Sequence, residues 1–461
     1  FSEVSMDHSK VLGEESIEKL IVKFSIPAII GMLVNALYNV VDRIFIGNGV
    51  GSLALSGLTV TFPIMLISMA LSMLIGLGAT SLISIKLGEK KKEEAEKIAA
   101  NAFTLLIGVS LIYSVVFLLF LDKILLLFGA SQNTLAYARD YLSIILYGSI
   151  FQFIGFGMNH FIRAEGNPKR AMSTMVIGAV LNTVLDPLFI FVFKMGVQGA
   201  AIATIISQAV SAAWVLYYFM AKKSTVKIHA ANMKLSWKYV RQIVSMGLAP
   251  FSIQLVGSIY NLILNNSLAR YGGDKAIAAM GIISSAAMIV MMPVFGINQG
   301  TQPIVGYNYG AGKYDRVKKA LMYAYIGATF FVVLGFLSAM LFPTQIIQFF
   351  NRTDGELVSI GVPAMRIFSL LMPVIGFQIV SSNYFQAIGK PKKSMFLTLL
   401  RQLIVLIPMV IILPLFFGLN GIWYAVPMSD GISTMLTTVF MYFELKELNK
   451  KITETVKVPA I

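Results

Sequence analysis

The sequence predicts an all-α integral membrane protein with twelve transmembrane helices in two six-helix lobes. Composition is the first reason, because 57% of residues are hydrophobic and only 13% are charged, whereas soluble domains carry about 25% charged residues. The second reason is the alternation of long apolar stretches with short charged segments. The third is that the second half of the chain repeats the first.

Each apolar stretch reaches the ~20 residues that a helix needs to cross a bilayer. The expected spans, in order, are 22–46, 53–84, 98–121, 136–162, 169–193, 199–220, 240–268, 276–306, 320–342, 357–386, 394–417 and 421–443.

Basic residues indicate how these spans are oriented. They gather in alternate loops, after spans two, four, six, eight and ten, while the loops between are poor in Lys and Arg. Because basic loops stay on the cytoplasmic side, we expect both termini in the cytoplasm of a multi-pass plasma-membrane protein. The net charge of +15 then reports topology, and we expect no nucleic-acid partner.

The internal repeat is visible in several pairs of segments at an offset of about 222–224 residues. Pro27 matches Pro250, Asn39 matches Asn261, GNPKRA at Gly166 matches GKPKKS at Gly389, and GVQGAAIAT at Gly196 matches GLNGIWYAV at Gly418. Six spans per half give both halves the same orientation. We therefore expect a pseudo-two-fold axis along the membrane normal, with a ligand site between the lobes.

The repeat also sets the expected domain boundaries. They are an N-terminal cytoplasmic segment at 1–20, an N-lobe at 21–221, a cytoplasmic linker at 222–239, a C-lobe at 240–447 and a cytoplasmic tail at 448–461. We interpret the basic linker as a solvated loop.

The first span carries a carboxylate, Asp42, inside an apolar stretch. Such a group costs roughly 2.5–3.5 kcal/mol to insert and usually faces a cavity or a partner. Asn35, Tyr38 and Asn39 precede it at spacings that place all four on one helical face. Pro27, near the start of the span, lacks a backbone donor and can kink the helix.

The fifth span carries a second carboxylate, Asp186. Asn182 lies one turn earlier on the same face, and Pro187 leaves the carbonyl of Thr183 without its usual helical donor. Thr204 in the sixth span could add a hydroxyl group. These are hard oxygen groups, which suit a proton or a small cation such as Na⁺. The alternative is that the two acids are polar contacts between helices.

Other polar and sulfur-containing residues of the spans have less specific interpretations. Asp430 in span twelve is interpreted as a helix-packing acid whose partner is Arg366 or Arg401. The methionines of MIVMMP fit either packing or an adaptable wall for apolar ligands; they are Met288, Met291 and Met292.

Several chemistries find no support in the sequence. There is no Cys, and the three His residues are scattered, so neither a thiol centre nor a His-rich metal site is expected. No Walker A motif is present. We therefore expect neither enzyme activity nor a cofactor beyond a coupling ion.

The whole pattern resembles the MATE (multidrug and toxic compound extrusion) transporters, in the bacterial MepA-like and DinF-like branch, from Lys19 to about Leu448. The resemblance rests on the two six-span halves, the Pro27 to Asp42 spacing, the RAEGNPKRA loop and the Asn182–Pro187 motif. It implies a cation site at positions matching Asp42, Asn182, Asp186 and Thr204, with Tyr38 nearby. NorM-like members also use an acid in span seven, which this chain lacks.

The resemblance implies a multidrug efflux antiporter that exchanges organic, often cationic compounds for inward H⁺ or Na⁺ by alternating access of the lobes. The expected partners are small organic molecules and membrane lipid, and the expected state is a monomer. A flippase for lipid-linked precursors, from the same superfamily, is the alternative. That function would favour a wide basic cavity and usually fourteen spans.

Overall fold

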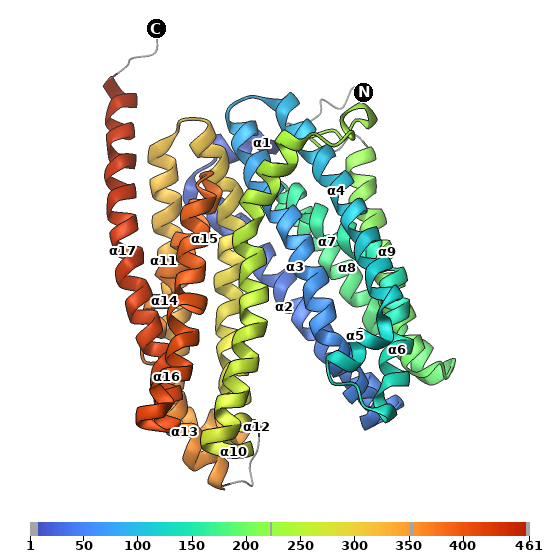
Figure 1. Ribbon diagram of the computed structural model, residues 1–461. Coiled ribbons are helices and arrows are strands. Elements are labelled where there is room, and N and C mark those ends of the chain that lie inside the picture. Colours follow the sequence, from blue (N-terminus) through green and yellow to red (C-terminus); the bar gives the residue numbers. More distant parts are fainter. Residues whose placement is uncertain (1–7, 222–223, 351–354, 458–461) are drawn as a thin grey trace. The chain divides into compact units, whose positions relative to one another are not determined.

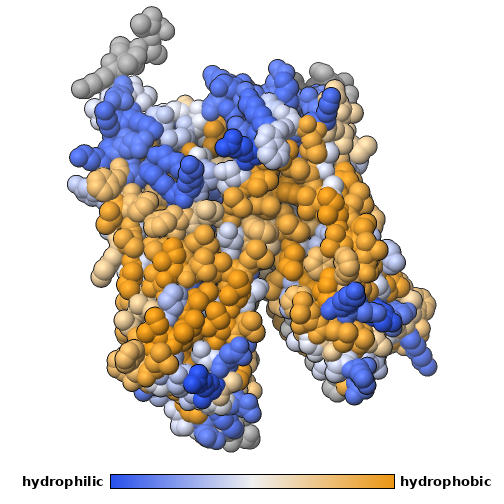
Figure 2. All heavy atoms as spheres, in the orientation of Figure 1, coloured by the Kyte–Doolittle hydropathy of each residue, from blue (hydrophilic) through white to orange (hydrophobic). Residues whose placement is uncertain are grey.

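The computed structural model describes residues 8–221, 224–350 and 355–457, and every regular element in these ranges is a helix (Figure 1). The chain divides into two compact units. Unit 1 comprises Phe1–Glu15 and Ile26–Phe251, and unit 2 comprises Ser16–Ser25 and Ser252–Ile461. In both units, apolar side chains cover the middle of the helices and hydrophilic side chains gather toward the helix ends (Figure 2).

Unit 1 is a bundle formed by the first half of the chain. Its helices are α1 (His8–Glu14), α2 (Ile17–Gly49), α3 (Ser52–Gly88), α4 (Lys92–Leu119), α5 (Leu121–Leu127), α6 (Gln132–Tyr147), α7 (Ser149–Ala164), α8 (Pro168–Pro187), the π-helical η1 (Leu188–Val192) and α9 (Gly196–Met220). The start of α2, up to Ser25, belongs to unit 2. Helix α3 packs on α4, α6 and α7, while α9 packs on α6, α7 and α8. Small residues allow this close packing: Ala200 and Ala201 of α9 are fully buried beside Tyr141 of α6.

Unit 2 repeats this arrangement in the second half. Its helices are α10 (Trp237–Gly310), α11 (Tyr314–Leu341), α12 (Pro343–Phe350), α13 (Gly355–Ser369), α14 (Met372–Ala387), α15 (Pro391–Leu399), the π-helical η3 (Leu400–Leu406), α16 (Ile407–Phe417) and α17 (Leu419–Lys457). Helix α14 packs on α11, α15 and α17, and α17 also packs on η3 and α16.

The predicted spans are confirmed as helices, although several are less regular than expected. Eight described helices are long and apolar enough to cross a membrane, or ten when each of two bent pairs counts as one span. The bends are 57° between α6 and α7 and 48° between α13 and α14. Two further spans complete the twelve: α10 holds two, separated at Gly273 (φ 63°), and the less apolar α17 holds the last.

Helix α10 begins in very close contact with α3, and glycines make this contact possible. A Cβ atom at Gly247 would overlap the carbonyl oxygen of Leu74, and one at Gly78 would overlap the carbonyl oxygen of Ile243. The start of α10 therefore belongs to unit 1, although the rest of the helix from Ser252 belongs to unit 2.

The linker after α9 is anchored to unit 1 at its start, where three residues are buried, whereas most of its later described residues are exposed, as inferred from its charge. Ser224 and Val226 are 3% and 2% exposed. Farther along, Asn101 Nδ2 donates to the carbonyl oxygen of Asn232 (3.2 Å), and Asn101 Oδ1 accepts from the N–H of Ser236 (2.8 Å). The short 3₁₀ helix η2 (Ala230–Asn232) lies within the part of the linker that Asn101 holds by these hydrogen bonds.

Glu165, in the loop between α7 and α8, is the main anchor of the linker. This fully buried carboxyl accepts hydrogen bonds from Ser224 Oγ (2.7 Å) and from the N–H of Val226 (3.0 Å). Burial raises the pKa of Glu165 to about 7, although both hydrogen bonds favour its charged form.

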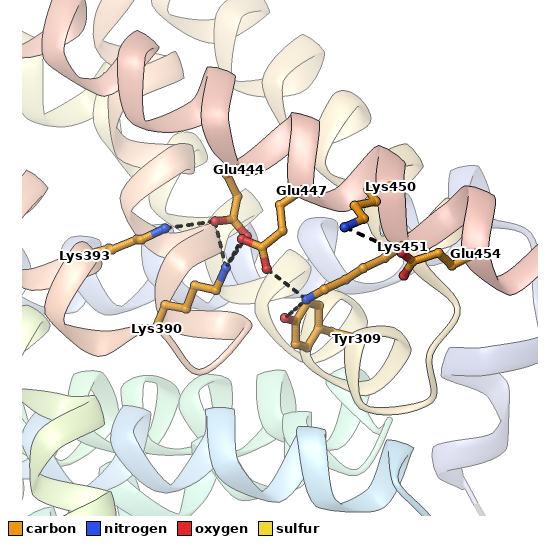
Figure 3. Close-up of polar contacts among 8 residues, drawn as sticks. All are labelled: Tyr309, Lys390, Lys393, Glu444, Glu447, Lys450, Lys451 and Glu454. Atoms are coloured by element: carbon orange, nitrogen blue, oxygen red, sulfur yellow. Dashed lines mark hydrogen bonds and ion pairs between the residues drawn. The ribbon is translucent and has the colours of Figure 1, made fainter.

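In unit 2, a cluster of charges anchors the end of α17 (Figure 3). Lys390, between α14 and α15, lies 2.8 Å from both carboxylate oxygens of Glu444, which is only 2% exposed. Glu447 forms ion pairs with Lys390 and Lys451, and Lys451 Nζ donates a hydrogen bond to the hydroxyl of Tyr309 (3.0 Å). Both halves therefore tie the segment after their sixth helix to the loop between their fourth and fifth helices.

We predict that Gly247→Ala destabilises the protein, because the added methyl group overlaps backbone of α3. Overpacking of this kind costs roughly 1–3 kcal/mol. Gly257→Ala is the matched control in the same helix, since an added Cβ there meets nothing within 4 Å. Thermal unfolding of the detergent-purified protein compares the two variants, and equal unfolding temperatures would contradict the prediction.

We also predict that Glu165 makes stability fall as pH rises. Its pKa is about 7 when folded against an ordinary value of 4.5, so its contribution is complete below about pH 4.5 and is lost up to about pH 7. The loss is at most roughly 3 kcal/mol, at about 1.4 kcal/mol per pKa unit. Glu165→Gln should remove this dependence, as measured by unfolding temperature between pH 5 and pH 8. Parallel curves for the variant and the natural protein would refute it.

Candidate cation site

The two acids predicted in separate spans of the first half meet inside unit 1. Asp42 of α2 is 8% exposed, and Asp186 near the end of α8 is fully buried. Their carboxyl groups lie close enough together to interact electrostatically. Two carboxyl groups lie this close favourably only when they share a proton or a cation, because two bare carboxylates repel.

Asn182 and Thr204 complete the predicted set. Asn182 lies one helical turn before Asp186, so its Nδ2 reaches Asp186 Oδ1 at 3.2 Å. The same Nδ2 lies 3.4 Å from Thr204 Oγ1, because α8 and α9 pack side by side. Thr204 in turn donates to the carbonyl oxygen of Ala200 (3.0 Å), which directs the hydroxyl lone pairs toward Asn182.

The hydrogen-bonding pattern of the helix changes at this point. The α-helical hydrogen bonding of α8 ends at Pro187, and the chain continues as the π helix η1. Proline has no N–H to offer the carbonyl of Thr183, so the ladder must be interrupted where Asp186 lies. Short π segments within helices often occur at functional sites.

The cluster has more oxygen atoms than donors. Asn182 Oδ1 and Asp186 Oδ2 are buried with no hydrogen-bond partner among the described residues. Buried acceptors of this kind normally have a partner. No described group of three or more His, Cys, Asp or Glu residues is placed to hold a metal ion. The donor set therefore fits a proton or a hard monovalent cation.

Tyr141 of α6, which was not predicted from the sequence, joins this cluster. The side chain is 3% exposed and lies close to Thr204, Tyr38 and both carboxyl groups. The only sequence signal was its position on the buried face of α6, with Ala138, Leu142 and Ile145. We name Tyr141, Asp42, Asn182, Asp186 and Thr204 the carboxylate centre.

The other predicted ligand-contact residues lie apart from these five. Asn35 and Tyr38 are half-buried on α2, and Pro27 is buried near its start. The side chain of Asn39 falls outside the described residues. The three methionines belong to α10 in unit 2, where Met288 is 61% exposed while Met291 and Met292 are half-buried.

Two six-helix lobes that span a membrane, one of them enclosing a pair of acids able to hold a small cation, define a polytopic membrane transporter. The chain belongs to the MatE family, whose model matches residues 27–188 and 251–412, once in each half. The family resemblance inferred from the sequence is thereby confirmed, as is the duplication that underlies the two lobes.

Known relatives are similar in sequence to this protein over nearly its whole length. The multidrug export protein MepA of Staphylococcus haemolyticus is 28% identical over 431 residues, covering 93% of this chain and 94% of the relative. MepA of Staphylococcus aureus is 29% identical over 428 residues, covering 92% and 93%.

Solved structures place the fold in the same group. The MATE multidrug transporter DinF-BH, solved as a complex, is 44% identical with a TM-score of 0.87, covering 93% of this chain and 96% of that one. An outward-facing multidrug resistance MATE transporter of the MOP superfamily gives a TM-score of 0.88 at 28% identity, covering 95% and 98%.

We predict that Thr204→Val weakens cation binding at the carboxylate centre, since it replaces the hydroxyl group with a methyl group of similar size. Losing one such contact costs roughly 1 kcal/mol, or about fivefold in affinity. Thr183→Val is the matched control, because its hydroxyl bonds only the Ala179 carbonyl of its own helix (2.9 Å). Protection against thermal unfolding by Na⁺ (balanced with choline) and by lowered pH measures binding. Indistinguishable curves for Thr204→Val and Thr183→Val would exclude this role.

Proposed function

We propose that the protein is a multidrug efflux antiporter. It exports organic compounds, often cationic and amphipathic, in exchange for inward H⁺ or Na⁺. The observation that carries this proposal is the proximity of the buried Asp42 and Asp186, beside acceptor oxygens of Asn182 and Asp186 that have no hydrogen-bond partner among the described residues. The relatives support the drug substrate, since MepA is a multidrug export protein and DinF-BH is a multidrug transporter.

The carboxylate centre is the proposed coupling site. A proton or Na⁺ between the acids relieves their repulsion, and release of the ion restores it, so occupancy changes the energy of this part of unit 1. Asn182 and Thr204 supply neutral oxygen atoms to the ion, and Tyr141 supplies a phenolic hydroxyl group. The position matching Asp42 in the second half is the buried Leu264, so coupling is assigned to the first half alone.

The ion gradient is large enough to drive export. One charge crossing about 100 mV yields about 2.3 kcal/mol, or roughly fifty-fold in concentration, and one pH unit yields about 1.4 kcal/mol. In this proposal the lobes alternate access to the two sides of the membrane. The proposed substrate contacts in the first half are Asn35 and Tyr38 of α2. In the second half, considered by itself, the proposed contact is the exposed Met288 of α10.

The basic loops support a cytoplasmic location for both termini in the plasma membrane. We propose that the protein works as a monomer and needs no cofactor other than the coupling ion.

We predict that Asp42→Asn abolishes gradient-driven ethidium efflux from proteoliposomes, because an amide cannot release and rebind the coupling ion. A pH gradient and a Na⁺ gradient are imposed separately, so that the response of the natural protein identifies the ion. Asp140→Asn is the control, since Asp140 is an exposed acid beside Tyr141 in sequence.

Full gradient-driven efflux by Asp42→Asn would overturn the assignment of the coupling site. Absence of any response of the natural protein to either gradient would overturn the antiporter itself.

A further inference from the structure

Unit 2 contains its own buried charged centre. Arg401 Nε donates to Asp430 Oδ1 at 2.6 Å, and Asp430 is 1% exposed whereas the Arg401 side chain is 23% exposed. The alternative partner expected from sequence, Arg366, is an exposed residue of α13. Tyr260 of α10 lies against both charged groups. We name Tyr260, Arg401 and Asp430 the ion-pair centre.

The ion-pair centre and the carboxylate centre are assembled from equivalent helices of the repeat. The first helix of each half contains a Tyr-Asn pair, Tyr38-Asn39 and Tyr260-Asn261. Tyr38 lies close to Tyr141 of the carboxylate centre, as Tyr260 lies close to the charges of unit 2. The fifth helix contributes Asp186 in one half and Arg401 in the other, and the sixth contributes Thr204 or Asp430.

The two centres differ in their charge. The carboxylate centre, as far as the structure describes it, combines two acids with neutral groups, and the proposed function assigns it a cation from outside the chain. The ion-pair centre combines one acid with one guanidinium group, so its charges cancel without any ligand. Because a lone buried carboxylate is costly, this internal compensation allows Asp430 to remain buried.

The guanidinium group of Arg401 is positioned by an irregular stretch of backbone. Arg401 lies in the π helix η3, and Ser429 Oγ donates to its carbonyl oxygen (2.8 Å), which ties that segment to α17. Asp430 Oδ2 and Ser433 Oγ are buried without hydrogen-bond partners in the part of the chain that the structure describes. The ion-pair centre therefore has more oxygen acceptors than donors, as a cation site does. The guanidinium group of Arg401 supplies the positive charge.

We propose that Asp430 is a cation-binding carboxylate whose ligand is the chain's own guanidinium group. Arg401 has in unit 2 the role that a transported cation has in unit 1, and a small guanidinium-class cation would take its place if the side chain were removed. Only its corollary, that ion coupling belongs to the first half, rests on the proposed function.

Chemical rescue tests the proposal on the full-length protein in detergent. Arg401→Ala should unfold several degrees below the natural protein, since it leaves a buried carboxylate unpaired. Methylguanidinium should restore much of this loss, because its planar N–H donors match a carboxylate. Tetramethylammonium, which has the same charge but no N–H donor, should not. The natural protein and Arg366→Ala should show no gain.

The double variant Arg401→Ala/Asp430→Ala identifies the atoms responsible and should show no rescue. Equal protection of the single and double variants by methylguanidinium, or no protection of a folded Arg401→Ala protein, would overturn the proposal.

A transport assay keeps the proposal testable if Arg401→Ala does not fold. Arg401→Leu/Asp430→Leu removes both charges together and should retain gradient-driven ethidium efflux with unchanged ion dependence. Loss of that dependence would show that the ion-pair centre takes part in coupling and would overturn the corollary. Unaltered gradient-driven efflux by the Asp42→Asn protein would instead overturn the proposed function. The result of the methylguanidinium rescue would then stand independently.

Discussion

The cost of burying a carboxylate away from water organises both halves of this protein. Unit 1 brings Asp42 and Asp186 close together beside neutral oxygen atoms, an arrangement that a proton or another cation would stabilise. Unit 2 compensates Asp430 with Arg401. One fold, duplicated, therefore holds one centre for which we propose an external cation and one whose charge is compensated by its own side chain.

In both halves, irregular backbone lies next to the buried charged groups. Helix α8 changes from α to π hydrogen bonding directly after Pro187, next to Asp186, whereas η3 carries Arg401 and ends just before Pro408. A proline in a membrane helix frees a carbonyl group that neighbouring helices must accommodate. In each half the fifth helix thus carries a charge where its regular ladder is interrupted, and the sixth helix packs against that interruption.

Charge also fastens the segments outside the bundle, with opposite signs in the two halves. Glu165 holds the backbone and hydroxyl donors of the linker, while Lys390 and Lys393 hold Glu444 on the extension of α17. The repeat keeps the position of the anchor but not its chemistry. The reason is that the segments after the two sixth helices differ: the linker presents backbone N–H groups, whereas the extension of α17 is a helix with acidic side chains.

The sequence by itself determined the fold class, the number of spans, the duplication, and four of the five members of the carboxylate centre. These follow from apolar length, helical spacing and the rarity of acids in membrane spans, all of which are local properties. Tertiary structure alone decided that Tyr141 joins that centre and that Arg401, not Arg366, neutralises Asp430. It also decided that the buried start of the linker is held by Glu165. Those outcomes depend on which helix faces meet, and a periodic pattern shows which face is buried without showing against what it packs.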